Sequence, residues 1–151
     1  MSVIGHVSIE GVKVSPADVA KIPAGNLRVS RAEFVALWQA AEQCHDEQLR
    51  RGVPDWYGAG VVETCRWLAI VEPKTEPWHL APSPVTRRTQ VAYGDLIEAE
   101  CHVAGQLAGS RPLPARLRSR PGWIEGVVAT LNWAWRRHGS PPLDTRRFAW
   151  G

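Results

Sequence analysis

The chain has 151 residues, 44% of them hydrophobic and 22% charged, which is enough for one domain with its own core and excludes a wholly disordered chain. No apolar run approaches the ~20 residues that span a bilayer, and the first residues lack the pattern of a secretory signal, so we expect a cytoplasmic protein with no membrane partner. The formal net charge of +3 is unevenly placed, because the eight arginines from residue 111 onward are accompanied by only two acidic residues, Glu125 and Asp144.

Residues 1–29 are expected to form an appendage to the main part of the domain. Hydrophobic residues at positions 7, 9, 12 and 14 flank Glu10-Gly11, which predicts a short N-terminal β-hairpin. Ser15 followed by proline at the first helical position predicts a short helix, which ends before Pro23.

Two longer helices are expected next. Ser30 begins a capping box, and apolar residues then recur at three- and four-residue intervals until a Gly-Val-Pro stop, which predicts a helix over 30–51. A second helix follows over about 56–70. Residues 71–88 contain four prolines and are expected to form a loop.

The second half of the chain follows the same order. Apolar spacing predicts a third helix over about 90–107. A basic connection with several prolines covers 109–122, and a fourth helix is expected over about 121–137. Its end is marked by Gly-Ser-Pro-Pro at 139–142.

The two halves share an eight-residue motif. Residues 60–67, Gly-Val-Val-Glu-Thr-Cys-Arg-Trp, align with 126–133, Gly-Val-Val-Ala-Thr-Leu-Asn-Trp, at a constant offset of 66, and five of the eight residues are identical. Ala-Glu-Gln-Cys-His at 41–45 also resembles Ala-Glu-Cys-His at 99–102. Self-similarity at a fixed period is the signature of a repeat architecture.

The segments that leave each helix pair also match. Ser-Pro followed by Thr-Arg-Arg occurs at 83–88 and again at 140–147. Three matches in the same order predict a duplicated helix pair within a single domain, 1–151. The first repeat is expected over 30–88 and the second over 89–151.

Gly60 and Gly126 begin the shared motif inside predicted helices. Glycine costs about 1 kcal/mol there relative to alanine, so we expect a close approach of the two helices to compensate. The predicted fold class is mainly α: a four-helix arrangement from a duplicated helix pair, with the short N-terminal β-hairpin against one side.

Tryptophan is unusually frequent, with eight in the chain. One tryptophan buries about 200 Å², so most of them are expected in the core or at its rim. Trp78 and Trp150 lie in irregular or terminal segments, where they either fold back onto the domain or contact a partner.

Two Cys-His pairs offer a metal interpretation, because two cysteines and two histidines can complete a tetrahedral zinc site. Adjacent helical residues diverge by about 100° around the axis, and neither pair has zinc-finger spacing, so these are weak candidates and we expect no metal. The odd number of cysteines indicates reduced thiols. The candidate ligands are Cys44, His45, Cys101 and His102.

No catalytic signature is evident. The chain has no Gly-x-Ser-x-Gly motif, no phosphate-binding glycine loop and no dinucleotide fingerprint. Glu42 and His45 have the Glu-x-x-His spacing of di-iron bundles, but the second half does not reproduce it. We expect no cofactor and favour a protein that is not an enzyme, although an enzyme of unfamiliar type is left open.

The matching exits of the two helix pairs give the functional hypothesis. If the pseudo-symmetry places them equivalently, they form a surface that carries tryptophan and arginine, which are enriched at binding hot spots. We therefore expect a non-catalytic adaptor or regulatory module that binds another protein. The candidate partner-binding residues are Trp78, Arg87, Arg88, Arg146, Arg147 and Trp150.

The alternative is a nucleic-acid-binding protein that uses its basic C-terminal third. Arginines alternate with apolar residues over 111–120, and two more close the fourth helix, so this stripe could contact phosphates. Loop arginines are equally explained as solvated groups, and cations suit a helix C-terminus. The residues of this alternative are Arg111, Arg116, Arg118, Arg120, Arg136 and Arg137.

Overall fold

The computed structural model describes residues 14–52, 55–70, 82–88 and 90–145. These residues contain helices and no strand. In chain order the elements are α2 (Pro16–Lys21), the 3-10 turn η1 (Ala24–Asn26), α3 (Arg31–Arg51), α4 (Trp56–Leu68), α5 (Gly94–Ala108), α6 (Ala115–Arg118) and α7 (Trp123–Arg136).

The predicted fold class is therefore wrong in its β-hairpin, and the described part of the chain is all-α. Most of the segment assigned to the hairpin, 7–13, lies outside the described residues. Val14, its one described residue, is not in a strand and lies directly before the cap of α2. Alternation of a few valines predicts strands only weakly when no partner strand is available to pair with them.

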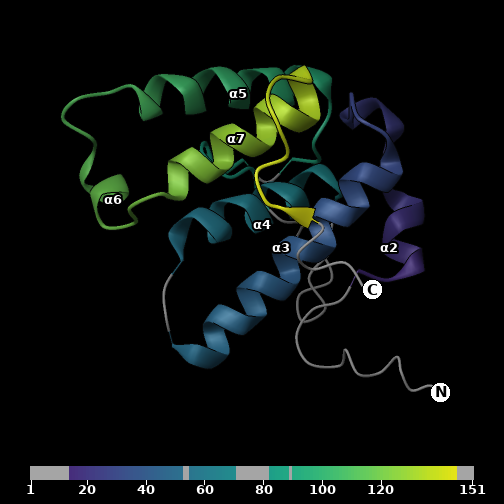
Figure 1. Ribbon diagram of the computed structural model, residues 1–151. Coiled ribbons are helices and arrows are strands. Elements are labelled where there is room, and N and C mark those ends of the chain that lie inside the picture. Colours follow the sequence, from purple (N-terminus) through teal and green to yellow (C-terminus); the bar gives the residue numbers. More distant parts are fainter. Residues whose placement is uncertain (1–13, 53–54, 71–81, 89, 146–151) are drawn as a thin grey trace.

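The four longer helices are arranged in the order α3, α4, α7 and α5 (Figure 1). α4 and α7 cross at the centre and make the most extensive contact. α3 packs against α4 on one side, and α5 packs against α7 on the other. In the first half of the chain α3 therefore covers α4, and in the second half α5 covers α7.

Capping residues place the first two helices where the sequence predicts them. The Ser15 hydroxyl accepts from the backbone N–H of Asp18, and the Ser30 hydroxyl accepts from that of Glu33, each in a complete capping box. Gly52 ends α3 in the left-handed region, with φ 69°.

α5 begins at Gly94, about four residues later than predicted. The reason is a tertiary contact: the buried side chain of Asn26 donates to the backbone oxygens of Leu68, at 2.9 Å, and Ala92, at 3.2 Å. These bonds hold the chain before α5 against η1, where the preceding residues cannot continue the helix. The predicted basic connection contains the short helix α6, which sequence spacing does not reveal.

The central pair meets through its glycines, which confirms the predicted close approach. A Cβ added to Gly60 would collide with the backbone oxygen of Trp123 and lie 3.1 Å from the nitrogen of Val127. A Cβ added to Gly126 would collide with the backbone oxygen of Tyr57 and lie 3.3 Å from the nitrogen of Val61. Neither helix could carry any other residue at this point without moving the other.

The threonines of the shared motif make the same bond in both halves. The Thr64 hydroxyl donates to the backbone oxygen of Gly60, and the Thr130 hydroxyl to that of Gly126, both at 2.8 Å. Val61 and Val127 are both completely buried beside them. The two copies of the motif thus occupy equivalent environments across the α4–α7 contact.

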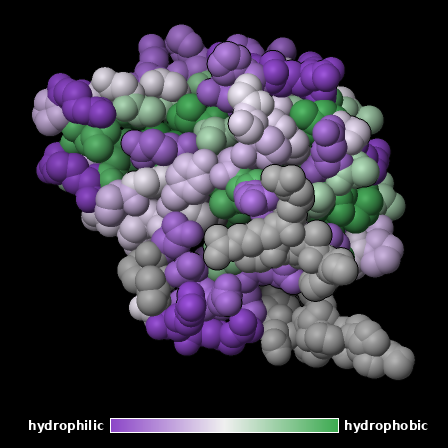
Figure 2. Space-filling model, viewed as in Figure 1, coloured by the Kyte–Doolittle hydropathy of each residue, from purple (hydrophilic) through white to green (hydrophobic). Residues whose placement is uncertain are grey.

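Six of the eight tryptophans lie in the core or at its rim, as expected. Trp38, Trp67, Trp123 and Trp133 are buried, and Trp56 and Trp135 pack against the core, whereas Trp78 and Trp150 lie outside the described residues. Seen from the side of Figure 1, hydrophilic residues gather over α6, and hydrophobic surface shows only as separate patches (Figure 2). Within the described ranges, no helix combines the length and the apolar character that a membrane span requires.

Candidate binding pocket

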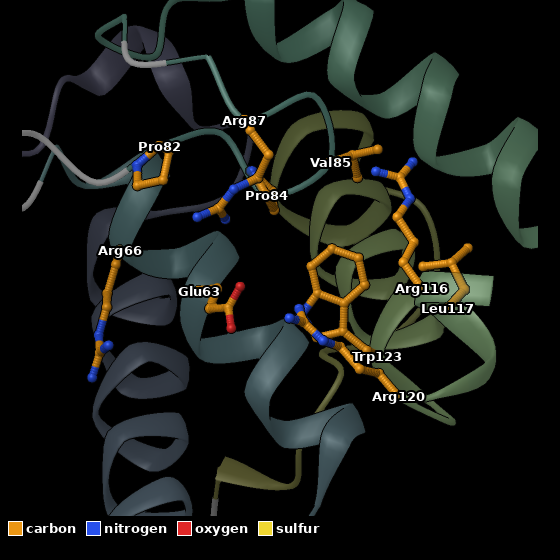
Figure 3. A pocket seen from close by; sticks show the side chains of 10 residues that line it. All are labelled: Glu63, Arg66, Pro82, Pro84, Val85, Arg87, Arg116, Leu117, Arg120 and Trp123. Carbon is orange, nitrogen blue, oxygen red and sulfur yellow. The ribbon is translucent and has the colours of Figure 1, made fainter. Parts of the chain in front are cut away.

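A pocket of about 570 Å³ opens between α4, the 82–88 turn and the α6–α7 region (Figure 3). Its polar lining is dominated by guanidinium groups, with a single carboxylate. Two prolines, two aliphatic side chains and an indole complete the walls. The lining residues are Glu63, Arg66, Pro82, Pro84, Val85, Arg87, Arg116, Leu117, Arg120 and Trp123.

Arg87 is presented by a tightly closed turn. The Ser83 backbone N–H donates to the Arg88 oxygen at 2.9 Å, and the Arg88 N–H donates to the Ser83 hydroxyl at 2.8 Å. Arg87 itself has φ 60°, a left-handed conformation that costs a non-glycine residue about 1 kcal/mol or more. The closed turn holds this residue in a conformation that it would otherwise leave.

Glu100 of α5 anchors that turn. Its carboxylate is only 2% exposed and accepts from the backbone N–H groups of Val85 and Thr86 and from the Thr86 hydroxyl. A buried carboxylate must be hydrogen-bonded to be tolerated, and these donors meet that need. The turn therefore has one fixed position on the bundle, and this position determines where Arg87 projects.

Arg120 lies close to two tryptophans. Its Cζ lies 5.6 Å from the ring centroid of Trp56 and 5.7 Å from that of Trp123, which are cation–π distances. Trp56 belongs to the start of α4 and Trp123 to the start of α7, so both halves of the chain contribute. Arg120 and the Trp123 ring lie together on one wall of the pocket (Figure 3).

Arg66 lines the pocket but its charge is already paired. Its Nε and Nη2 donate to the two oxygens of Glu42 at 2.8 and 2.7 Å, and its side chain points away from the pocket toward α3 (Figure 3). The hydrogen bonds to Glu42 raise the pKa of Arg66 further, with burial acting in the opposite direction. The Trp38 indole also donates to Glu42, which is 4% exposed.

Three arginines of the pocket remain available. Among the described residues, the guanidinium groups of Arg87, Arg116 and Arg120 have no ion pair and no hydrogen bond. The Trp123 indole N–H is buried and, in the same part of the chain, also has no hydrogen-bond partner. The described lining contains one carboxylate, that of Glu63, so the three arginines give the pocket an excess of positive charge.

Glu63, Arg66 and Trp123 line the pocket but are not among the site residues predicted from the sequence. A signal was present: within the shared motif, the positions of Glu63 and Arg66 are held by Ala129 and Asn132 in the second half of the chain. The glycine, valine, threonine and tryptophan positions are the same in both copies, and all of these residues except Val128 are buried. The two copies differ at the polar positions, because only the first copy carries the charged residues Glu63 and Arg66, which line the pocket.

The predicted partner-binding surface is described only in part. Arg87 lines the pocket, whereas Arg88 is exposed and does not belong to its lining. The other four residues of that surface, Trp78, Arg146, Arg147 and Trp150, lie outside the described residues. The Tyr57 hydroxyl donates to the Pro142 oxygen at 3.1 Å, which holds the second exit segment against the start of α4.

The arginines of the nucleic-acid alternative separate into two groups. Arg116 and Arg120 line the pocket. Arg111 donates to the Ala108 and Ser110 oxygens, Arg118 to the Leu113 oxygen, and Arg136 pairs with Glu98 at 2.7 Å, while Arg137 occupies a left-handed position after α7. Three of the six guanidinium groups therefore have intramolecular partners.

The weak metal candidates are on two separate outer helices, with Cys44 and His45 in α3 and Cys101 and His102 in α5. No group of three or more His, Cys, Asp or Glu side chains that could hold a metal ion occurs in the described ranges. Burial raises the pKa of the Cys101 thiol, and also that of Cys65 in α4, which disfavours the thiolate that a metal or a nucleophilic reaction requires.

A second hollow of about 330 Å³ lies at the turn between α3 and α4. Leu49, Trp56 and Ala59 give it an apolar lining, and no arginine of the described residues contributes to it. The charged pocket is therefore the stronger candidate for recognition. Compared with protein-family models, curated proteins and solved structures, the chain matches none.

Proposed function

We propose that this protein is a non-catalytic binding module that captures another protein by an acidic segment of that partner. The observation that carries the proposal is the pocket in which the guanidinium groups of Arg87, Arg116 and Arg120 have no ion pair and no hydrogen bond within the described structure. Unpaired guanidinium groups beside apolar walls form strong, geometrically specific bonds to anionic side chains.

The lining argues for binding rather than catalysis. Guanidinium groups stay protonated in proteins, so they cannot exchange protons with a substrate at neutral pH. Glu63 is the one carboxylate of the lining, and no histidine, cysteine, serine or lysine of the described residues joins it. The described lining of the pocket therefore contains no nucleophile with an adjacent base, the minimum for most covalent mechanisms.

A protein partner is favoured over nucleic acid. Binding to a nucleic-acid backbone uses a run of cations that follows successive phosphates. In this protein Arg111 and Arg118 donate hydrogen bonds to backbone oxygens, and Arg136 forms an ion pair with Glu98. The three arginines that remain available line a single pocket. A hollow of this kind suits a single inserted side chain.

The test compares two triple variants with the same change in net charge. R87Q/R116Q/R120Q removes the pocket arginines, and R111Q/R118Q/R137Q removes three that do not line it. Proteins captured from a lysate of the native organism by the unchanged chain are expected to be lost with the first variant and retained with the second. Equal capture by all three proteins would refute the proposal. A salt-sensitive mobility shift of DNA or RNA that survives the first variant would favour the nucleic-acid alternative.

A further inference from the structure

The excess positive charge of the pocket favours a ligand with more than one negative charge. Three available guanidinium groups, those of Arg87, Arg116 and Arg120, stand against the single carboxylate of Glu63, so two positive charges are uncompensated. An Asp or Glu side chain would supply one negative charge. A phosphate monoester supplies about 1.5 to 2 at neutral pH.

The three arginines also come from different elements around the pocket. Arg87 comes from the 82–88 turn, Arg116 from α6, and Arg120 from the segment before α7 (Figure 3). A carboxylate is planar and is satisfied by one guanidinium group in a two-bond contact. The three terminal oxygens of a phosphate monoester point in three directions and can accept from donors on several sides.

The remaining walls fit the group that carries the phosphate. Pro82, Pro84 and Leu117 give the pocket apolar surface, and its volume of about 570 Å³ leaves room for more than a bare ion. Glu63 can accept a hydrogen bond from an amide or hydroxyl beside the phosphate. We infer that the pocket is a binding site for a phosphate monoester, carried by a phosphorylated serine or threonine of the partner or by a small molecule.

Part of the pocket is positioned before a ligand arrives. The guanidinium carbon of Arg120 lies within cation–π distance of the rings of Trp56 and Trp123, and the backbone that carries Arg87 is held by the turn that Glu100 anchors. Fixing flexible side chains on binding costs affinity, so a site whose donors are already placed binds more tightly. The inference rests on the proposed use of this pocket for binding and adds the chemistry of the bound group.

Calorimetric titration with small blocked amino acids tests the chemistry without a known partner. The probes are N-acetyl-O-phosphoserine amide, the corresponding glutamate and serine amides, and glycerol 3-phosphate. The phosphoserine compound is expected to bind at least about tenfold more tightly than the glutamate compound, and the serine compound not at all. Tighter binding of glycerol 3-phosphate than of phosphoserine would support the site and assign it to a small molecule.

Two residues of one short helix provide the matched control. R116Q is expected to weaken phosphoserine binding about tenfold, whereas R118Q, two residues away, leaves it within about twofold because Arg118 donates to the Leu113 oxygen and does not line the pocket. E63Q removes the repulsion between Glu63 and the phosphate and is expected to strengthen binding a few-fold.

Equal affinity for phosphoserine and glutamate, no binding of either phosphate compound, or equal losses with R116Q and R118Q would each overturn the inference. Its failure is separable from that of the proposed function. If partner capture needs the pocket arginines but phosphate is not preferred, the inference alone fails. If phosphoserine binds the pocket but R87Q/R116Q/R120Q captures the same proteins as the unchanged chain, the proposed function alone fails.

Discussion

Gly60 of α4 and Gly126 of α7 make the same contact from opposite sides, because each faces the backbone of the other helix three residues before the partner glycine. Gly60 meets the backbone oxygen of Trp123, and Gly126 meets that of Tyr57. The two pairs of positions are related by the offset that relates the two copies of the motif. This reciprocity is what a pseudo-two-fold axis between α4 and α7 requires.

Alanine at either glycine is expected to destabilise the fold strongly. In G60A and G126A the new methyl group collides with a backbone oxygen, which cannot rotate away as a side chain would. Overpacking of this kind costs typically 1–3 kcal/mol, and we expect about 3 kcal/mol for each variant by urea unfolding.

G105A is the matched control, since Gly105 lies inside α5 and has no neighbour within 4 Å of an added Cβ. There alanine should stabilise the protein by up to about 1 kcal/mol through helix propensity. A G60A protein as stable as the unchanged chain would mean that the two helices do not approach closely in solution.

Removing the partner of the buried Glu42 is expected to be costly. R66M leaves that carboxylate with the Trp38 indole as its remaining partner among the described groups, so we expect a loss of about 3 kcal/mol in unfolding free energy. The double variant E42Q/R66M removes the uncompensated charge and should recover most of this loss. A double variant no more stable than R66M would contradict the assigned pairing.

Glu100 is expected to act as a positioning residue for Arg87. E100A leaves the N–H groups of Val85 and Thr86 without their acceptor, which should cost about 2–3 kcal/mol and release the turn. Hydrogen exchange should become faster at these two amides while α7 keeps its protection. The affinity for phosphoserine should also fall, although Glu100 does not line the pocket. Unchanged amide hydrogen exchange at residues 85 and 86 in E100A would refute the positioning role of Glu100.

Glu98 makes a small contribution to stability that depends on pH. The hydrogen bond from the Trp135 indole, at 2.8 Å, lowers the pKa of Glu98 from its usual value; burial acts in the opposite direction, and Arg136 lowers the pKa further. A carboxyl group with a lowered pKa in the folded state stabilises the protein above its unfolded pKa of about 4.3, and this contribution is lost as the pH falls through the folded value.

We therefore expect E98Q to be less stable than the unchanged chain at pH 7, by about 0.5 kcal/mol because the pair is exposed, and equally stable near pH 2. E47Q, at an exposed position of α3 with no ion pair in the described structure, should leave stability unchanged at both pH values. A difference between E98Q and the unchanged chain that grows in acid would have the wrong sign for this account.

The helices could be predicted because local signals determine them. The Ser30 capping box and the left-handed Gly52 mark the ends of α3 without any tertiary information. The start of α5 and the short helix α6 could not be predicted, because the contact of Asn26 with Ala92 and the burial of Leu117 are made by segments far apart in the chain.

The candidate site was predicted only in fragments. The sequence predicts Arg87 on one surface and Arg116 and Arg120 on a competing one, since nothing in their spacing indicates that they line one hollow. Which arginines are available depends on partners such as Glu42 for Arg66, and these are set by helix packing. The differences between the two copies of the motif, at Glu63 and Arg66, were the one local signal for the site.

The central claim is that three particular arginines form one site for an anionic group. Nuclear magnetic resonance of the arginine Nε–H groups during titration with N-acetyl-O-phosphoserine amide measures this directly. The signals of Arg87, Arg116 and Arg120 should shift together along one saturating curve, while those of Arg111 and Arg136 stay in place. Shifts spread evenly over all the arginines, or absent from these three, would contradict the account.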